Sequence, residues 1–158
     1  PQKNYLNLLD LLNQLPFLTS LTIAGRGSQE KLIIERAYNL NLDIELLGCI
    51  NHDDLPKLIN KCNIYIQNSI FEGNPKSVLE AMSSGAIILC RDSPGMNKLV
   101  IDRFNGFLYN TKNFNKVINN IINSKSLNLQ RENARNYVIN NCSYSKYLSN
   151  LNFILKNN

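Results

Sequence analysis

Two glutamates flanking a glycine-proline turn are the residues of this 158-residue sequence with the clearest chemical potential. They lie in FEGNPKSVLEAMSSG, residues 71–85, where Glu72 precedes Gly73 and Pro75, and Glu80 follows. An ionised carboxylate only accepts hydrogen bonds, so Glu72 suits a ligand with hydroxyl donors, such as a sugar. Gly73 lets a ligand approach the backbone, and Pro75 presets the first turn of a helix. The stretch is therefore a candidate binding site.

The helix predicted over residues 75–85 has a physical reason to bind phosphate at its start. Backbone amides near Ser77 and Val78 would be free donors at the positive end of the helix. Glu80 is ambiguous, because it lies opposite the apolar face that contains Val78 and close to Lys76, as on an ordinary solvated helix face. Periodicity alone leaves open whether Glu80 faces a ligand.

Short apolar strands alternate with helices around this turn. The predicted strands cover residues 18–25, 43–48, 63–68, 86–90 and 106–109. The predicted helices cover residues 3–15, 28–40 with Ser28 as N-cap, 53–62 with acidic residues in its first turn, 75–85 and 95–102, and residues 113–158 indicate two or three more.

The strands are continuous apolar runs, which predicts burial on both faces and hence a parallel sheet covered by helices. The fold class is therefore α/β, with a Rossmann-like parallel sheet and helices on both faces. In such sheets ligands bind beyond the carboxyl ends of the strands, where the Glu72 turn lies.

Composition and charge limit the classes of ligand and partner that the chain could bind. Hydrophobic residues make up 44% and charged residues 18%, which is typical of a globular protein. No apolar run approaches the ~20 residues that cross a bilayer. The net charge is +5, but the basic residues are scattered, which argues against a nucleic-acid partner. This mild charge suits an anionic ligand or an anionic membrane surface equally well.

The cysteines and the single histidine do not indicate a metal site. Cys49, Cys62, Cys90 and Cys142 form no C-x-x-C pair, and no histidine cluster accompanies them. Cys49 and Cys90 lie in apolar runs, where cysteine acts as a small hydrophobe. We therefore expect four free thiols in a reducing, cytoplasmic setting. His52 lies in a loop and is interpreted as a surface residue.

The stretch FEGNPKSVLEAMSSGAIILC resembles the signature of the group 1 (family 4) glycosyltransferases, roughly E-G-x-P-x-x-x-x-E-A-M-x-x-G followed by an apolar strand. The matching positions are Glu72, Gly73, Pro75, Glu80, Ala81, Met82 and Gly85. Further segments fit the family in the same order: PQKNYLNLLDLL, LTIAGRGSQEKL, IELLGCINHDDLPKLINKCNIYIQNS and IDRFNGFLY. One segment departs from it, because residues 94–98 replace the family's two glycines, proline and glutamate.

This resemblance implies one half of a GT-B fold, in which two Rossmann-like domains face each other across a cleft. Residues 1–158 would be the C-terminal domain that binds a nucleotide sugar, without its first strand and with a terminal helix at 143–158. The resemblance also implies retaining transfer of a hexosyl group to a glycan or lipid-linked acceptor, with no metal and no cofactor. The partners would be the sugar nucleotide and an N-terminal acceptor-binding domain, and the fragment alone would be inactive.

The resemblance further assigns roles to individual residues. Glu80 would hold the ribose hydroxyls, Glu72 would hold hydroxyls of the donor sugar, and Lys3 would neutralise the departing diphosphate. The remaining residues would line the substrate, with Gly73, Asn74 and Pro75 around the sugar, the Ser77 and Val78 amides at the diphosphate, and Ile50 and Asn51 near the base. Glu72 and Lys3 are thus the predicted catalytic residues.

Two other functions remain open at this stage. A non-catalytic doubly wound nucleotide-binding or regulatory module is compatible with the fold and predicts no dependence on Glu72 or Glu80. A related sugar-nucleotide enzyme, such as an epimerase or a phosphorylase-like protein, fits the motif less well. The expected setting is bacterial surface-glycan biosynthesis, of lipopolysaccharide or capsule, in the cytoplasm. Association of the full enzyme with the inner face of the membrane stays open.

Overall fold

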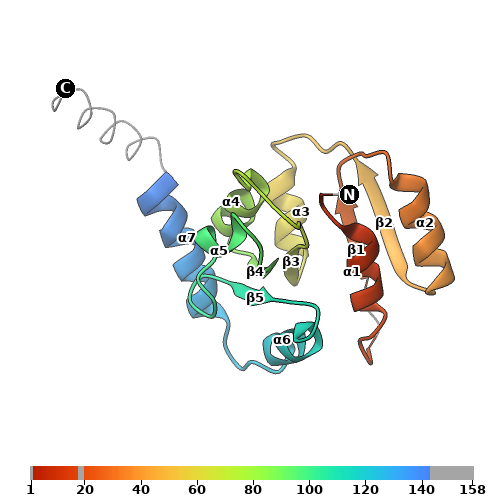
Figure 1. The fold of residues 1–158 in the computed structure, drawn as a ribbon. Coiled ribbons are helices and arrows are strands. Elements are labelled where there is room, and N and C mark those ends of the chain that lie inside the picture. Colours follow the sequence, from red (N-terminus) through yellow and green to blue (C-terminus); the bar gives the residue numbers. More distant parts are fainter. Residues whose placement is uncertain (1, 18–19, 143–158) are drawn as a thin grey trace.

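A computed structural model describes residues 2–17 and 20–142 as alternating helices and parallel strands (Figure 1). The strands are β1 (Ser20–Ala24), β2 (Asp43–Gly48), β3 (Ile64–Gln67), β4 (Ile87–Arg91) and β5 (Phe107–Tyr109). The helices are α1 (Tyr5–Leu12), α2 (Glu30–Asn39), α3 (Leu55–Lys61), α4 (Lys76–Ser83), α5 (Met96–Leu99), α6 (Phe114–Ile122) and α7 (Asn128–Cys142). The predicted order of elements is confirmed, and the helix predicted over 143–158 lies outside the described residues.

The strands form two parallel sheets instead of the single sheet that we predicted. β1 pairs with β2, and β3, β4 and β5 pair in that order. Within the described residues β1 and β3 are edge strands that do not pair with each other. Leu21 of β1 and Ile64 and Ile66 of β3 nevertheless pack against the same apolar cluster. The two sheets therefore share a core without sharing hydrogen bonds.

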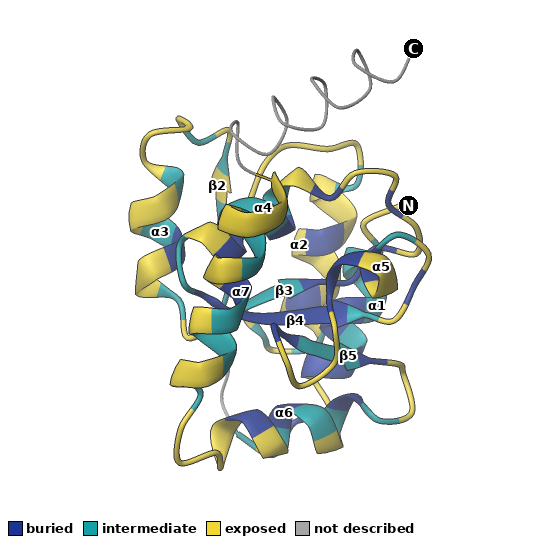
Figure 2. Ribbon diagram, turned by 90° about the vertical axis from the view of Figure 1, so that its left-hand side faces the viewer, coloured by how far each residue is buried: buried dark blue, intermediate teal, exposed yellow. Residues whose placement is uncertain are grey.

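β4 is the buried centre of the larger sheet. Ile87 and Leu89 face the cluster that contains α1 and α6, whereas Ile88 and Cys90 face the cluster that contains α4, α5 and α7. Side chains alternate across a strand, so helices on both faces bury every second residue in opposite directions. Figure 2 shows β4 buried at the middle of the molecule. The predicted burial on both faces is confirmed for this strand.

The smaller sheet differs from that prediction. Exposed and partly buried residues alternate strictly along β2, and the ends of β1 are exposed. The apolar cluster at this sheet joins Ile23 to Leu9 of α1 and to Ile33 and Ala37 of α2, so helices cover one face. In the part of the chain that the structure describes, the other face of β2 carries the exposed Asp43, Glu45 and Leu47, so the expectation of burial on both faces is wrong here.

The cysteines follow the same division between the sheets. Cys90 on β4 is fully buried, as predicted, whereas Cys49 lies just beyond β2 and is exposed. The expectation that Cys49 is an interior residue is therefore wrong, because it lies in the bend after β2 and not in a buried strand. All four cysteines are free thiols.

Two predicted helix starts need correction. Ser28 is not the N-cap of α2, because Gln29 occupies that position and makes no side-chain cap. α3 begins at Leu55 with a proline in its first turn, so the acidic residues lie before the helix and not inside it. Proline favours the first helical turn because its missing N–H needs no partner there. Asp54 instead accepts a hydrogen bond from Lys57 at 2.9 Å.

Candidate functional site

The turn that carries Glu72 lies at the carboxyl ends of β3 and β4. Its Glu72 amide donates to Pro94 O at 3.1 Å, and Ser93 Oγ donates to Ser69 O at 2.8 Å. Gly95 has a φ of 90°, and a Cβ built on it would collide with the backbone carbonyl of Glu72. The loop after β4 therefore supports this turn from behind and requires glycine at its closest point.

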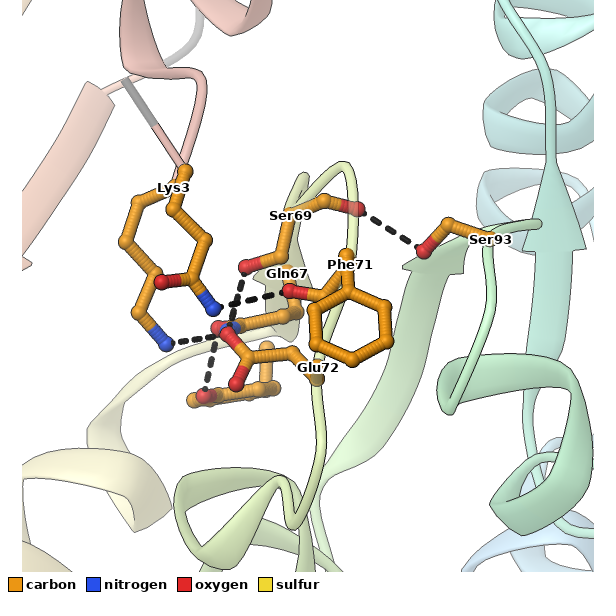
Figure 3. A network of polar contacts seen from close by, with 8 residues as sticks. Lys3, Gln67, Ser69, Phe71, Glu72 and Ser93 are labelled. Carbon is orange, nitrogen blue, oxygen red and sulfur yellow. Dashed lines mark hydrogen bonds and ion pairs between the residues drawn. The ribbon is translucent and has the colours of Figure 1, made fainter.

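The N-terminal residues pack along the same turn (Figure 3). The Ile70 amide donates to Gln2 O at 3.0 Å, and Gln2 Nε2 donates to Phe71 O at 2.9 Å. Next to them, Lys3 Nζ lies 2.6 Å from Glu72 Oε1. The structure thus brings together the two predicted catalytic residues, which are 69 positions apart in the sequence.

The Glu72 carboxylate is buried, with only 8% of the residue exposed, and it is held by three side chains. Besides Lys3, Ser69 Oγ donates to Oε1 at 2.8 Å and Gln67 Nε2 donates to Oε1 at 3.2 Å. Burial alone would raise the pKa of Glu72, but these hydrogen bonds and the Lys3 charge together lower it. Glu72 is therefore ionised at neutral pH, and both of its oxygens can only accept hydrogen bonds.

This lowered pKa predicts a pH dependence of stability. A carboxyl whose pKa is lower in the folded state stabilises that state above its unfolded pKa, and loses this contribution as the pH falls through the folded pKa. We expect Glu72→Gln to flatten the decline of the free energy of unfolding below the ordinary glutamate pKa of 4.5. Urea unfolding between pH 3 and 7 measures this, with Glu35→Gln on α2 as the control. An unchanged slope in Glu72→Gln would show that the network does not hold the folded carboxylate.

Glu80 lies on α4 with its side chain 35% exposed, while Val78, Ala81 and Met82 of the same helix are fully buried. The predicted apolar face of this helix is therefore confirmed. His52 Nδ1 lies 3.8 Å from Glu80 Oε1. His52 is exposed, as expected for a loop histidine, but its contact with Glu80 was not foreseen. The contact places the loop of Ile50 and Asn51 beside α4.

A hollow of about 340 Å³ adjoins Glu80. It lies between α3, α4 and α7 and is lined by His52, Leu55, Pro56, Ile59, Leu79, Glu80, Ser83, Ser84, Val138 and Cys142. Its walls are mostly apolar, and Glu80, His52, Ser83 and Ser84 contribute the polar side chains. Such a hollow can accept a flat apolar group attached to a part with hydroxyl donors.

One of the two backbone amides predicted to be free at the start of α4 is already hydrogen-bonded. Pro75 is the N-cap, and its carbonyl accepts a hydrogen bond from the Val78 amide at 3.0 Å. The Val78 amide is therefore not free, because the carbonyl of an N-cap residue accepts the first bond of the helix. Asn74 O accepts from the Lys76 amide at 2.9 Å, which shapes the turn between Glu72 and the helix. Gly73 and Asn74 are exposed in this turn, and Ser77 is half-buried.

Three polar residues of the site were not singled out from the sequence: Gln67, Ser69 and Ser93. Of these three, only Gln67 could have been identified as a site residue from the sequence, because it is a polar residue at the carboxyl end of an apolar strand. Ser69 and Ser93 are ordinary loop serines in the sequence, and only their contacts reveal their place in the site.

Neither metal ligands nor membrane spans are found in the described ranges. Within residues 2–17 and 20–142, His, Cys, Asp and Glu residues do not gather in groups of three that could hold a metal ion. None of the helices in those ranges has the length and hydrophobicity needed to cross a bilayer.

This chain is similar in sequence to a known protein family and to described relatives. The model of a family described as glycosyl transferases group 1 matches residues 1–141. The UDP-Gal:alpha-D-GlcNAc-diphosphoundecaprenol alpha-1,3-galactosyltransferase of Escherichia coli is 30% identical over 89% of this chain and 38% of its own length. The alpha-1,3/1,6-mannosyltransferase ALG2 of Dictyostelium discoideum is 29% identical over 77% of this chain and 30% of its own length. The chain thus spans well under half the length of these relatives.

Solved structures agree on the fold. The catalytic domain of cholesterol-alpha-glucosyltransferase from Helicobacter pylori matches with a TM-score of 0.79 and 21% identity, over 88% of this chain and 91% of that domain. HepE of Anabaena in complex with UDP-glucose matches with a TM-score of 0.78 and 24% identity, over 95% of this chain and 46% of its own. The C-terminal domain of a group 1 glycosyl transferase from Francisella tularensis matches with a TM-score of 0.74 and 18% identity, over 90% of this chain and 81% of that domain.

Proposed function

From the premise that this chain belongs to the group 1 glycosyl transferases, we propose that it is the donor-binding domain of a longer GT-B enzyme. The domain binds a nucleotide-diphosphate sugar, and the enzyme transfers its hexosyl group with retention of configuration to a glycan or lipid-linked acceptor. The observation that carries this proposal is the contact between Lys3 and Glu72 at the carboxyl ends of β3 and β4. The UDP-glucose bound to a protein of the same fold supports it.

Each predicted residue has a part in the proposed reaction. Glu72 accepts a hydroxyl of the donor sugar, and Lys3 moves from Glu72 to the diphosphate as negative charge develops on the leaving group. Because Pro75 already uses the Val78 amide, we expect the Ser77 amide to be the main backbone donor at the start of α4.

The nucleoside lies on the other side of the same helix. Glu80 accepts the ribose hydroxyls, and Ile50 and Asn51 lie near the base. The contact between His52 and Glu80 supports this placement, because it shows that the loop after β2 reaches α4. The proposed reaction uses neither a metal nor a cofactor, so activity should survive treatment with EDTA.

We also propose that a further strand completes the sheet. β1 and β3 are both edge strands, yet their apolar residues pack against one cluster together with α1. A strand preceding α1 would lie parallel between them, since a strand, helix and strand connect by a right-handed crossover. Such a strand would be the first strand of the donor domain in the longer enzyme.

The remaining partners follow from the proposed reaction. An N-terminal domain of the same protein binds the acceptor and faces the Glu72 turn across the cleft. The name of the Escherichia coli relative includes a diphosphoundecaprenol acceptor, which supports a lipid-linked acceptor in surface-glycan biosynthesis. We therefore place the full enzyme in the bacterial cytoplasm, in peripheral contact with the inner face of the membrane.

The role of Glu80 is tested by nucleotide binding to the full-length enzyme. Titration calorimetry with UDP, GDP and ADP identifies the nucleotide that binds. Glu80→Ala should weaken that binding by about 1–3 kcal/mol, because it removes hydrogen bonds to a charged acceptor.

The matched control for this titration is Glu35→Ala, an exposed glutamate of α2 that should leave the affinity unchanged. Equal affinity of the Glu80 variant and the unsubstituted enzyme would remove Glu80 from the site. It would also favour a regulatory module that does not use these residues.

A further inference from the structure

A chain of buried hydrogen bonds runs from β3 to the Glu72 carboxylate. The hydroxyl of Tyr65 donates to Gln67 Oε1 at 3.1 Å, and Gln67 Nε2 donates to Ser69 Oγ at 2.9 Å and to Glu72 Oε1 at 3.2 Å. Gln67 is only 7% exposed and Ser69 is fully buried. Both ends of the Gln67 amide thus have partners inside the protein, while Lys3 on the outer side is half exposed.

The orientation of this amide is set by Glu72. An ionised carboxylate only accepts hydrogen bonds, so the end of the Gln67 amide that faces Glu72 must be Nε2. The amide oxygen then faces Tyr65, and burial raises the pKa of the Tyr65 hydroxyl, which stays protonated and donates to Oε1. The strand therefore presents a fixed donor to the acid, and this donor needs no ligand to be in place.

The donors reach only one oxygen of the acid. In the described part of the chain, the hydrogen bonds to the Glu72 side chain from Lys3, Gln67 and Ser69 all end on Oε1. Oε2 is left to accept from a ligand. Lys3 is the most exposed member of this set, and its amine is needed elsewhere in the proposed reaction. Once Lys3 turns to a diphosphate, only Gln67 and Ser69 hold Oε1.

We propose that Gln67 is a positioning residue that anchors Oε1 of Glu72 and thereby presents Oε2 to a hydroxyl of the donor sugar. This inference rests on the function proposed above. It assigns to β3 a part in catalysis beyond support of the sheet. A carboxylate that is in position before the ligand binds does not have to reorient in the transition state. This preorganisation lowers the activation free energy.

The test uses Gln67→Met in the full-length enzyme, because methionine keeps the length of the side chain and removes the amide. Turnover is measured with UDP-glucose, UDP-galactose and GDP-mannose as donors. We expect kcat to fall about 10-fold, which corresponds to the loss of about one hydrogen bond to a charged group, while KM changes less than 3-fold. Tyr65→Phe, which leaves the amide in place but removes the partner of its oxygen, should give a smaller fall.

Two further measurements separate positioning from a general loss of stability. Titration of the ¹³C-labelled Glu72 carboxyl by NMR, assigned through its loss in Glu72→Gln, should show a higher pKa in Gln67→Met. The acidic limb of the kcat/KM profile should move to higher pH with it. Gln130→Met on α7, which loses an exposed hydrogen bond to Arg103 O, is the control and should change neither quantity.

The outcomes distinguish the inference from the function on which it rests. Unchanged kcat in Gln67→Met, or an unchanged Glu72 pKa, would overturn the positioning role even if the enzyme turns over its donor normally. If the unsubstituted enzyme turns over none of the three donors and binds no nucleoside diphosphate, the proposed function fails. The NMR titration then decides by itself whether Gln67 orients Glu72. If Gln67→Met does not fold, Tyr65→Phe carries the same comparison.

Discussion

Replacing Lys3 by methionine in the full-length enzyme is expected to lower kcat by about 10²–10³-fold, the usual loss when one group that stabilises developing charge is removed. The Lys3 amine lies 2.6 Å from Glu72 Oε1 and half of the side chain is exposed, so a diphosphate in this turn can recruit it. Methionine has a similar length but carries no charge. The variant therefore removes the charge that the diphosphate needs while it keeps most of the side chain's volume.

Steady-state kinetics with the sugar nucleotide that the enzyme accepts measure this effect. Lys116→Met, on the exposed side of α6, is the matched control and should leave kcat unchanged. Glu72→Gln should also depress turnover and sugar selectivity more than affinity for the bare nucleotide, because Glu72 is proposed to contact only the sugar. If Lys3→Met retains full turnover, the contact between Lys3 and Glu72 is structural and the proposed reaction loses its main support.

Replacing Gly95 by alanine is expected to lower the free energy of unfolding by more than about 2 kcal/mol. The new Cβ would collide with the Glu72 carbonyl oxygen and would lie 2.8 Å from its carbonyl carbon. Both are backbone atoms and have no rotamer by which to move away. The φ of 90° adds strain for any residue with a side chain. The turn that carries Glu72 would therefore shift, and turnover should fall together with stability.

Urea unfolding at neutral pH measures the loss in Gly95→Ala. Gly27→Ala is the matched control, because a Cβ there meets no atom within 4 Å and the backbone at Gly27 is not in the left-handed region. It should change stability by no more than about 0.5 kcal/mol. Equal stabilities of the two variants would mean that the loop after β4 does not press against the Glu72 turn.

Gly95 lies in the segment in which the sequence departs from its family. Residues 94–98 differ from the family pattern, which gave no role to Pro94 or Gly95. In the structure Pro94 O accepts the Glu72 amide and Gly95 packs against the Glu72 carbonyl. The segment thus holds the Glu72 turn through backbone atoms, which place few demands on the side chains around them.

The sequence by itself determined the order of elements and the candidate turn. Helix and strand are governed by the spacing of apolar residues over a few positions, so the helix that buries Val78, Ala81 and Met82 was predictable. The turn from Glu72 to Pro75 was predictable because glycine and proline act through their own backbone. The family followed from the same stretch, because its glutamates, glycines and proline are local in sequence.

Only the tertiary structure decided which distant groups meet. Lys3 pairs with Glu72, which lies 69 positions further along the chain, and His52 lies close to Glu80. Gln67 donates a hydrogen bond to Glu72, although in the sequence it is only the last residue of a strand. The division of the strands into two sheets was likewise decided by packing, since β1 and β3 do not pair with each other within the described residues. Such contacts depend on how elements stack, and stacking is a property of the whole core that no short window of sequence contains.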